Sequence, residues 1–309
     1  MEIGHGSARI DLALEAKENA SLAKGEQIPG VHTEVVELDD MSITRIHIEN
    51  DEGAKALNKQ IGHYSTIEVP GLRKKDSALQ DRVAQTLAKE FALFMENVGI
   101  DENAKTLIIG LGNWNVTPDS LGPLVVDNVL VTRHFFELMP DKVRPGYRQV
   151  SAVAPGVLGT TGIETGEIVQ GIVDRTKPDL VIAVDALASR SLRRVNTTIQ
   201  IADTGIHPGS GIGNKRKALD QENLGVPVIA VGVPTVVYAS TIVNNSIEMV
   251  IRNARKQTDN TDAIFGALGK LSEEERLAMV REVLKPLGQD LLVTPKEIDQ
   301  FIEDMANII

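Results

Sequence analysis

The sequence predicts an α/β protein with a doubly wound, mostly parallel sheet and helices on both faces. From about residue 105 onward, short apolar segments alternate with segments of helical periodicity, which is the pattern of successive βαβ units. Aromatic residues make up only 3% of the 309 residues, so Val, Ile, Leu and Ala must fill the core. Such side chains suit strands that helices cover on both sides.

The first part of the chain predicts a loose arm, a small β-rich part and a long helix. Residues 1–11 are polar, contain glycine and show no periodicity, so we expect the arm there. The β-rich part covers about residues 31–70. Its expected strands are residues 31–38, 42–49 and 64–69, which are separated by Asp, Gly and Asn. From about Asp76, apolar residues between Leu79 and Val98 recur at helical spacing and predict the helix.

The core of the predicted sheet covers about residues 105–255. The expected strands are residues 106–112, 179–187, 197–203 and 227–233, and the expected helices are residues 123–138, 163–176 and 235–254. The polar segment 256–263 predicts a linker. C-terminal helices are expected within about residues 272–309. Two capping boxes predict their starts, namely Ser272 with Glu275 and Thr294 with Glu297.

The composition excludes several classes of protein. The absence of cysteine excludes disulfides, a thiolate nucleophile and Cys-ligated zinc. A formal net charge of -11 argues against direct binding of nucleic acid, which needs a basic surface. The N-terminus lacks the pattern of a secretory signal, and Pro227 and Pro234 interrupt the longest uncharged stretch, residues 224–247. We therefore expect a cytoplasmic protein that makes no contact with a membrane.

Two acids follow or end expected strands of the core. Asp119 lies in the turn between the strand 106–112 and the next helix, and Asp185 lies at the tip of the strand 179–187. In an open α/β sheet, catalytic groups gather beyond the carboxyl ends of the strands. If the two strands are neighbours, about 4.8 Å apart, the two carboxylates face each other across one crevice.

The surroundings of the two acids suggest different roles. Asp119 precedes a helix N-terminus, which favours a carboxylate, whereas apolar neighbours raise the pKa of a carboxyl such as that of Asp185. Two such carboxyls can share one proton and polarise a water molecule between them. We expect Asp119 to be the base and Asp185 the acid. The reverse assignment stays open, because a coupled pair titrates as a unit.

Other motifs have simpler readings. A strand-end Asp is often only a helix cap or a turn former. His207, in the glycine-rich segment 207–213, is a metal ligand or a loop donor, and we favour the donor because no closely spaced histidine pair exists. Ser210 lacks the preceding glycine of a serine-hydrolase elbow, because Pro208 stands there. Asn115 replaces the last glycine of a dinucleotide-binding loop.

These segments closely resemble the spore germination proteases. The shared stretches are residues 110–123, 127–134, 155–165, 185–191, 201–217, 225–237 and 293–307. They are long, specific and in the same order, and they cover nearly the whole chain. The resemblance therefore extends beyond a shared fold.

The resemblance implies a function, an assembly and a location. The family degrades the small acid-soluble spore proteins during germination, assembles as a homotetramer and acts in the cytoplasm of the forespore, the spore core. Its proposed catalytic pair falls on Asp119 and Asp185. The fold is similar to that of hydrogenase maturation proteases. Their loop motif is matched by Gly110, Gly112, Asn113, Asp119 and Gly122. Those enzymes hold nickel, whereas the germination proteases are thought to work with no metal or other cofactor.

The resemblance also implies a zymogen that removes its own N-terminal segment. The segment 9–16 reads RIDLALEA and is similar to the acid-then-apolar sites that the family cuts. We expect cleavage between Asp11 and Leu12, which makes residues 1–11 a propeptide and residues 12–309 a single catalytic domain. Two other functions stay open. One is a metal-dependent protease that uses the same carboxylates with His207, and the other is a non-catalytic module that binds a peptide in the crevice.

Overall fold

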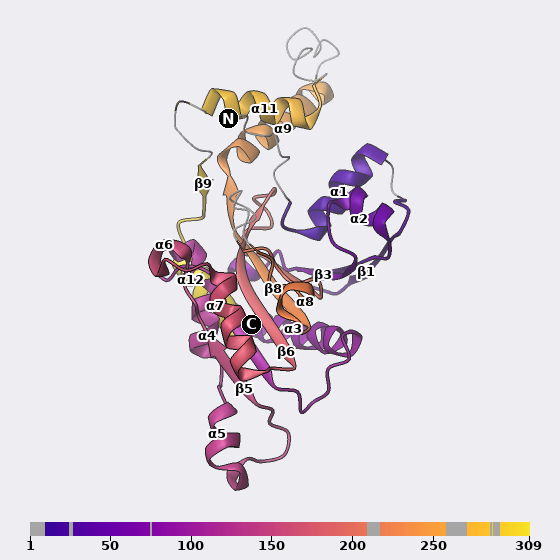
Figure 1. Ribbon diagram of the computed structural model, residues 1–309. Coiled ribbons are helices and arrows are strands. Elements are labelled where there is room, and N and C mark those ends of the chain that lie inside the picture. The colour runs from indigo at the N-terminus through magenta and orange to yellow at the C-terminus, as the bar shows by residue number, and fades with distance from the viewer. Residues whose placement is uncertain are drawn as a thin grey trace.

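A computed structural model describes residues 10–24, 27–74, 76–208, 217–257, 271–284, 286 and 291–309. It contains one mixed sheet with the strand order β1-β2-β3-β7-β8-β6-β4-β5, and β9 pairs with β8 (Figure 1). Helices lie against this sheet, so the predicted α/β class is confirmed. Within the described residues, no helix is both long and apolar enough to cross a bilayer.

Four strands of the core are parallel, three of them predicted and β5 not, whereas the predicted core strand 197–203 pairs antiparallel with its neighbours. The four parallel strands are β5 (Val150–Val153), β4 (Thr106–Gly110), β6 (Leu180–Ser189) and β8 (Val228–Tyr238). β4 pairs in parallel with both β5 and β6, and β6 pairs in parallel with β8. The alternation of side chains along β6 serves two cores: Leu180 and Val184 belong to one apolar cluster, and Val181 and Ala183 to the other.

Helices cover both faces of the core sheet. Three of them contribute to the cluster with Leu180, namely α3 (Ser77–Asn97), α4 (Leu121–Asn128) and α12 (Ile298–Ile308). The other cluster receives side chains from α7 (Thr165–Thr176) and α8 (Gln221–Leu224). Leu121 and Leu180 have no exposed side-chain surface, and such burial stabilises the fold by about 1.5–3 kcal/mol for each leucine.

The N-terminal β-rich part continues the same sheet. Its antiparallel strands are β1 (Val31–Glu37), β2 (Ser42–Ile48) and β3 (Gly62–Glu68). β3 pairs antiparallel with β7 (Thr198–Ala202), which pairs antiparallel with β8. Two helices that the sequence did not predict, α1 (Ala13–Lys24) and α2 (Asp51–Leu57), share an apolar cluster with these strands (Figure 1).

The predicted helix 123–138 is wrong, because the structure contains two helices there. α4 ends at Asn128, and α5 (Arg133–Leu138) follows. Val129 has an extended backbone (φ -72°, ψ 133°). Thr132 is bonded to β5 and the residues before it. Its N–H donates to the carbonyl oxygen of Val150 (2.9 Å), and its hydroxyl donates to the carbonyl oxygen of Arg148 (2.5 Å). These bonds hold the break in place.

The predicted helix 235–254 begins later than expected. β8 continues to Tyr238, and α9 runs from Ala239 to Gln257. Residues 236–238 stay in the strand because they pair with a strand on each side. Val236 and Val237 pair with β6, and Val237 and Tyr238 pair with β9 (Leu292–Val293). The predicted linker 256–263 falls partly on this helix, and residues 258–263 lie outside the described part of the chain.

One of the two capping boxes is confirmed and the other is wrong. α11 (Glu273–Leu284) begins with reciprocal bonds, in which the N–H of Ser272 donates to Glu275 and the N–H of Glu275 to the Ser272 hydroxyl. α12 begins only at Ile298, because the Thr294 hydroxyl donates instead to the carbonyl oxygen of Thr235 in β8 (2.8 Å). The short elements are η1 (Leu72–Lys74), η2 (Thr117–Asp119), η3 (Pro140–Lys142) and α6 (Leu158–Thr161).

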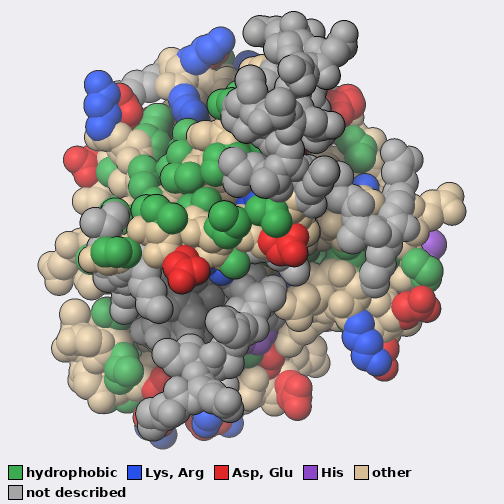
Figure 2. All heavy atoms as spheres, turned by 90° about the horizontal axis from the view of Figure 1, so that it is seen from above, with side chains coloured by type: hydrophobic (Ala, Val, Ile, Leu, Met, Phe, Trp, Pro, Cys, Tyr) green, Lys and Arg blue, Asp and Glu red, His purple; other side chains and the backbone are tan. Residues whose placement is uncertain are grey.

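One end of the molecule carries exposed apolar side chains. Figure 2 views this end from above and shows hydrophobic side chains gathered there. On α9 and α11 the exposed ones include Val243, Met249, Val250, Met279 and Val283. Grouped apolar surface of this kind is unusual for a monomer and is typical of an interaction surface.

Candidate active site

Asp119 and Asp185 line one cavity of about 400 Å³. Asp119 follows β4 and Asp185 lies in β6. The two strands are neighbours in the parallel sheet, which was the condition for the two carboxylates to share one crevice. The same cavity is lined by Asp11 and His207. The structure therefore brings together the two predicted acids, the acid of the predicted cleavage site and the predicted histidine.

Asp185 lies in β6 and is 7% exposed. Its Oδ1 atom accepts a hydrogen bond from the N–H of Ala186 (2.9 Å). Its register partner in β8 is Gly232, which is in turn the partner of Gln200 in β7. Side chains in one row of a sheet share a face, so Asp185 and Gln200 stand on the same face with only a glycine between them.

Asp119 ends the short helix η2, two residues before α4 begins at Leu121. Its carbonyl oxygen accepts from the N–H of Asn113 (3.0 Å), and its own N–H donates to the carbonyl oxygen of Val116 (2.8 Å). The Asn113 side chain also accepts from the N–H of Asn115 (3.0 Å). These bonds close the loop on itself and fix the backbone from which the Asp119 carboxylate projects.

Glycines let this loop pack against the sheet. Gly112 has φ +119°, and a Cβ atom there would overlap the carbonyl oxygen of Asp119. A Cβ atom on Gly122 would lie 2.6 Å from the carbonyl oxygen of Val184, and one on Gly110 would overlap the carbonyl oxygen of Gly122. The predicted supporting residues of the loop therefore bring Asp119 close to the end of β6.

The expected loose arm does not extend to its last residue. Residues 1–9 lie outside the described part of the chain, but Asp11 and Leu12 are packed against the sheet. Leu12 is fully buried, and the Asp11 Oδ2 atom accepts from the N–H of Ala188 in β6 (3.0 Å). From the sequence we expected that the entropy lost on ordering the arm would keep it loose. In the structure, the burial of Leu12 and the hydrogen bond of the Asp11 carboxylate offset this loss of entropy at the end of the arm.

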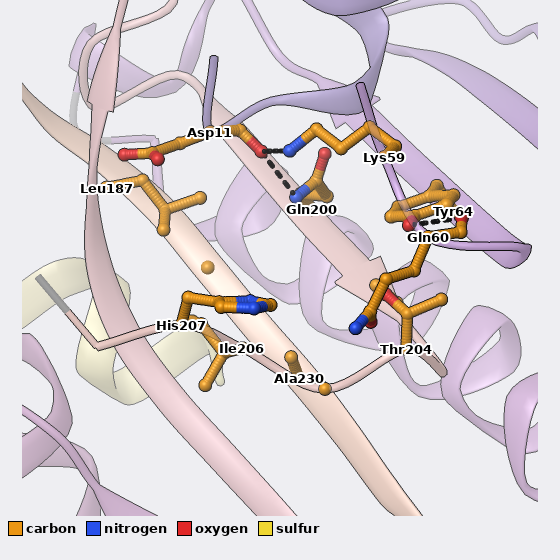
Figure 3. Close-up of a pocket in the computed structure, with 13 residues that line it drawn as sticks. Asp11, Lys59, Gln60, Tyr64, Leu187, Gln200, Thr204, Ile206, His207 and Ala230 are labelled. Carbon is orange, nitrogen blue, oxygen red and sulfur yellow. Dashed lines mark hydrogen bonds between the residues drawn. The ribbon is translucent and has the colours of Figure 1, made fainter. Parts of the chain in front are cut away.

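Two residues that sequence reasoning missed hold the backbone of the Asp11–Leu12 bond (Figure 3). The Lys59 Nζ atom donates to the carbonyl oxygen of Asp11 (2.6 Å), and Gln200 Nε2 donates to the same oxygen (3.4 Å). Gln200 Oε1 accepts from the N–H of Ala13 (2.6 Å). A signal for Gln200 existed, since a polar residue in the apolar strand TIQIA needs a buried partner. Lys59 gives no such signal.

The segment after the bond is held by a buried acid. Glu15 of α1 is 4% exposed and accepts from the Ser189 hydroxyl (2.7 Å) and the N–H of Arg190 (2.9 Å). The Arg194 guanidinium lies 3.5 Å from Glu15 and also pairs with Glu18 at 2.6 Å. Burial raises the pKa of the Glu15 carboxyl, and the bonds from Ser189 and Arg190 and the charge of Arg194 oppose this rise.

His207 lines both the 400 Å³ cavity and a smaller one of about 50 Å³. Figure 3 shows its ring across the smaller cavity from Asp11 and Gln200. Within the described ranges, no three His, Asp or Glu side chains are grouped as metal ligands.

The chain resembles known proteins over its full length. The profile of the family described as germination protease matches residues 9–263 and 252–309. The germination protease of Bacillus cytotoxicus is 48% identical over 342 aligned residues, which cover 100% of this chain and 93% of that protein. Those of Bacillus mycoides and Bacillus cereus (strain AH187) are each 47% identical with the same coverage.

One solved structure that matches part of the chain is that of the NiFe hydrogenase maturation protease HycI from Thermococcus kodakarensis. It is 22% identical, has a TM-score of 0.29, and covers 46% of this chain and 80% of the other. The full-length family match and the close relatives lead to one conclusion. This chain is a member of the germination protease family.

Proposed function

We propose that this chain is the endopeptidase that degrades small acid-soluble spore proteins during germination, and that it is made as a zymogen that cleaves itself between Asp11 and Leu12. Membership of the germination protease family supports the endopeptidase activity. One observation carries the self-cleavage: Asp11 lines the same cavity as Asp119 and Asp185. The residue before the proposed scissile bond thus lines the cavity of the two proposed catalytic acids.

The proposed mechanism is of the aspartic type. Asp119 takes a proton from water, and the water oxygen adds to the carbonyl carbon of the residue in the position of Asp11. The C–N bond then breaks as Asp185 gives a proton to the leaving amine. The new carboxyl and amine are the products, and the two acids have exchanged roles. A pair that shares one proton performs both transfers, each typically worth about 10²–10⁴-fold in rate.

The assembly we propose is a homotetramer in the cytoplasm of the forespore. The exposed apolar side chains of α9 and α11 support self-association, because copies of the chain can bury them against each other. We propose no cofactor and no direct contact with nucleic acid or membrane.

The test is the cleavage of a small acid-soluble spore protein by three variants. Asp119→Asn and Asp185→Asn remove one proton-transferring group each while keeping side-chain shape, and we expect kcat to fall by at least about 10²-fold. Asp127→Asn is the matched control, because Asp127 is exposed on α4 close to the same loop. Activity of either catalytic variant within about tenfold of wild type contradicts the mechanism. Absence of turnover by a wild-type chain that begins at Leu12 favours a peptide-binding module.

A further inference from the structure

The carbonyl oxygen of Asp11 is bound from two directions. Lys59 Nζ lies 2.6 Å from it and Gln200 Nε2 lies 3.4 Å from it. Lys59 lies in the loop between α2 and β3, whereas Gln200 lies in β7, the strand beside β3. Lys59 follows α2, and its own N–H closes that helix by donating to the carbonyl oxygen of Ala54 (3.1 Å). Gln200 is 8% exposed in β7.

We propose that Lys59 and Gln200 form a clamp for the carbonyl group that is hydrolysed, with Lys59 stabilising the oxyanion and Gln200 fixing the register of the bond. This inference rests on the proposed cleavage between Asp11 and Leu12, and it adds two catalytic residues to the two aspartates.

The charge of Lys59 is placed where negative charge develops. When water adds to the Asp11 carbon, the C=O π electrons move onto the carbonyl oxygen, which becomes an oxyanion. An ammonium group already at hydrogen-bond distance stabilises this oxyanion more than the neutral carbonyl, which is the condition for lowering the barrier. Collapse of the intermediate returns those electrons, breaks the C–N bond and frees the Leu12 amine.

No other positively charged side chain takes this place among the described residues. Of those that line the two cavities, only Lys59 is a lysine or arginine, while Asp11, Asp119 and Asp185 are carboxylates. Carboxyl groups carry no positive charge with which to bind an oxyanion. Lys59 supplies one from the β-rich part of the chain, which gives that part a direct role in the chemistry.

Gln200 forms hydrogen bonds with the backbone on both sides of the Asp11–Leu12 bond. Its Nε2 atom donates to the carbonyl oxygen of Asp11, and its Oε1 atom accepts from the N–H of Ala13 (2.6 Å). It stands in one row with Asp185, separated by Gly232. Because adjacent strands lie about 4.8 Å apart, the Cα atoms of Gln200 and Asp185 lie about two strand spacings apart. A shift of the peptide by one residue breaks both Gln200 bonds.

The test follows self-cleavage of the full chain, with the first-order rate measured by the appearance of the Leu12 N-terminus. We expect Lys59→Ala to slow cleavage by about 10²–10³-fold, as removal of an oxyanion donor does. Added butylamine should restore part of the rate in a saturable way, and an equal concentration of sodium chloride should not. Lys55→Ala is the control, because Lys55 is an exposed lysine of α2, the helix that Lys59 follows. A purely structural role of Lys59 gives no rescue by an amine.

Two outcomes overturn the clamp. One is a Lys59→Ala chain that cleaves within about threefold of wild type, and the other is a slow, folded chain that butylamine does not rescue. If Lys59→Ala does not fold, Lys59→Arg and Lys59→Gln replace it: the charged variant should cleave at least about tenfold faster, and equal rates contradict the proposal. A wild type that never cleaves itself contradicts the proposed function instead, so the two failures are distinguishable.

Discussion

The Asp11 carboxylate accepts a hydrogen bond from the backbone N–H of Ala188 at 3.0 Å, across 177 residues of sequence. Ala188 lies three residues beyond Asp185 in the same strand, β6. One strand therefore holds both a proposed catalytic acid and the side chain that precedes the proposed scissile bond. The acid side chain of the proposed cleavage site is therefore bound by a backbone group of the strand that carries Asp185.

This bond predicts that the charge of Asp11 matters for self-cleavage. A hydrogen bond to a charged group contributes about 1 kcal/mol more than a neutral one, so Asp11→Asn should slow cleavage about fivefold. Asp11→Ala loses the whole bond and should slow it by about 10–100-fold. Asp174→Asn, on the exposed face of α7, is the control. Cleavage of Asp11→Ala at the wild-type rate shows that Ala188 does not recognise the side chain.

The glycine loop predicts a large effect of a single methyl group. Gly112→Ala places a Cβ atom against the carbonyl oxygen of Asp119 and forces an alanine to φ +119°. We expect a loss of about 2–4 kcal/mol in the free energy of unfolding, together with loss of cleavage as Asp119 moves. Gly171→Ala in α7 meets no atom within 4 Å and should stabilise the helix by up to about 1 kcal/mol. Urea unfolding of both variants checks this, and equal stabilities contradict it.

The sequence predicted the part of the fold that depends on local patterns. The alternation of apolar strands and periodic helices predicted the parallel core, and β4, which precedes Asp119, is the neighbour of β6, which contains Asp185. Asp185 was expected at the tip of its strand but lies inside it, because β6 continues to Ser189. The errors arose where a distant segment supplied the hydrogen bonds. Thr294 was expected to cap a helix but bonds to Thr235, and residues 235–238 were expected to be helical but pair with β6 and β9. Single-sequence patterns contain no information about those partners.

The candidate site was predictable to a similar extent. Acids near the carboxyl ends of parallel strands can be recognised as candidate site residues from the sequence, because these strand ends meet at one edge of the sheet. Lys59 could not be found in this way, since an ordinary lysine after a short helix has no feature that separates it from an exposed one. Its partner is the backbone of Asp11, a contact 48 residues apart that only the assembled fold creates.

The buried acid of α1 predicts a pH dependence of stability. Burial raises the pKa of Glu15 in the folded protein above its unfolded value of 4.5. The stability from this shift is fully present below pH 4.5 and is lost as the pH rises through the folded pKa. Glu15→Gln keeps the shape but does not titrate, so its melting temperature should fall less than that of wild type between pH 4.5 and 7.5.

Glu18→Gln separates this effect from the ion pair with Arg194. Glu18 also bonds to Arg194 (2.6 Å), but its side chain is 49% exposed. Its variant should change the pH slope much less than Glu15→Gln does, because the charge of Glu18 is the smallest of the causes that raise the pKa of Glu15. The same slope in Glu15→Gln and wild type contradicts the assignment to Glu15.

A proton-sharing pair of aspartates predicts that activity survives removal of metal. The proposed site is rich in oxygen ligands, and two carboxylates with one histidine hold zinc poorly. Cleavage of a spore-protein substrate should therefore continue at the same rate after dialysis against a chelator. Stoichiometric metal in the active protein, with activity lost in chelator and restored by that metal, shows the metal-dependent alternative to be right.

The central claim is that the chain cuts itself between Asp11 and Leu12 with its own aspartates. Mildly acidic pH should promote the cut, because the mechanism needs one proton shared by the pair. The most direct measurement is mass spectrometry of the full chain and of Asp185→Asn after the same incubation. The account predicts that the wild type loses residues 1–11 and begins at Leu12, while Asp185→Asn stays intact. A different new N-terminus, or equal cleavage of the variant, contradicts it.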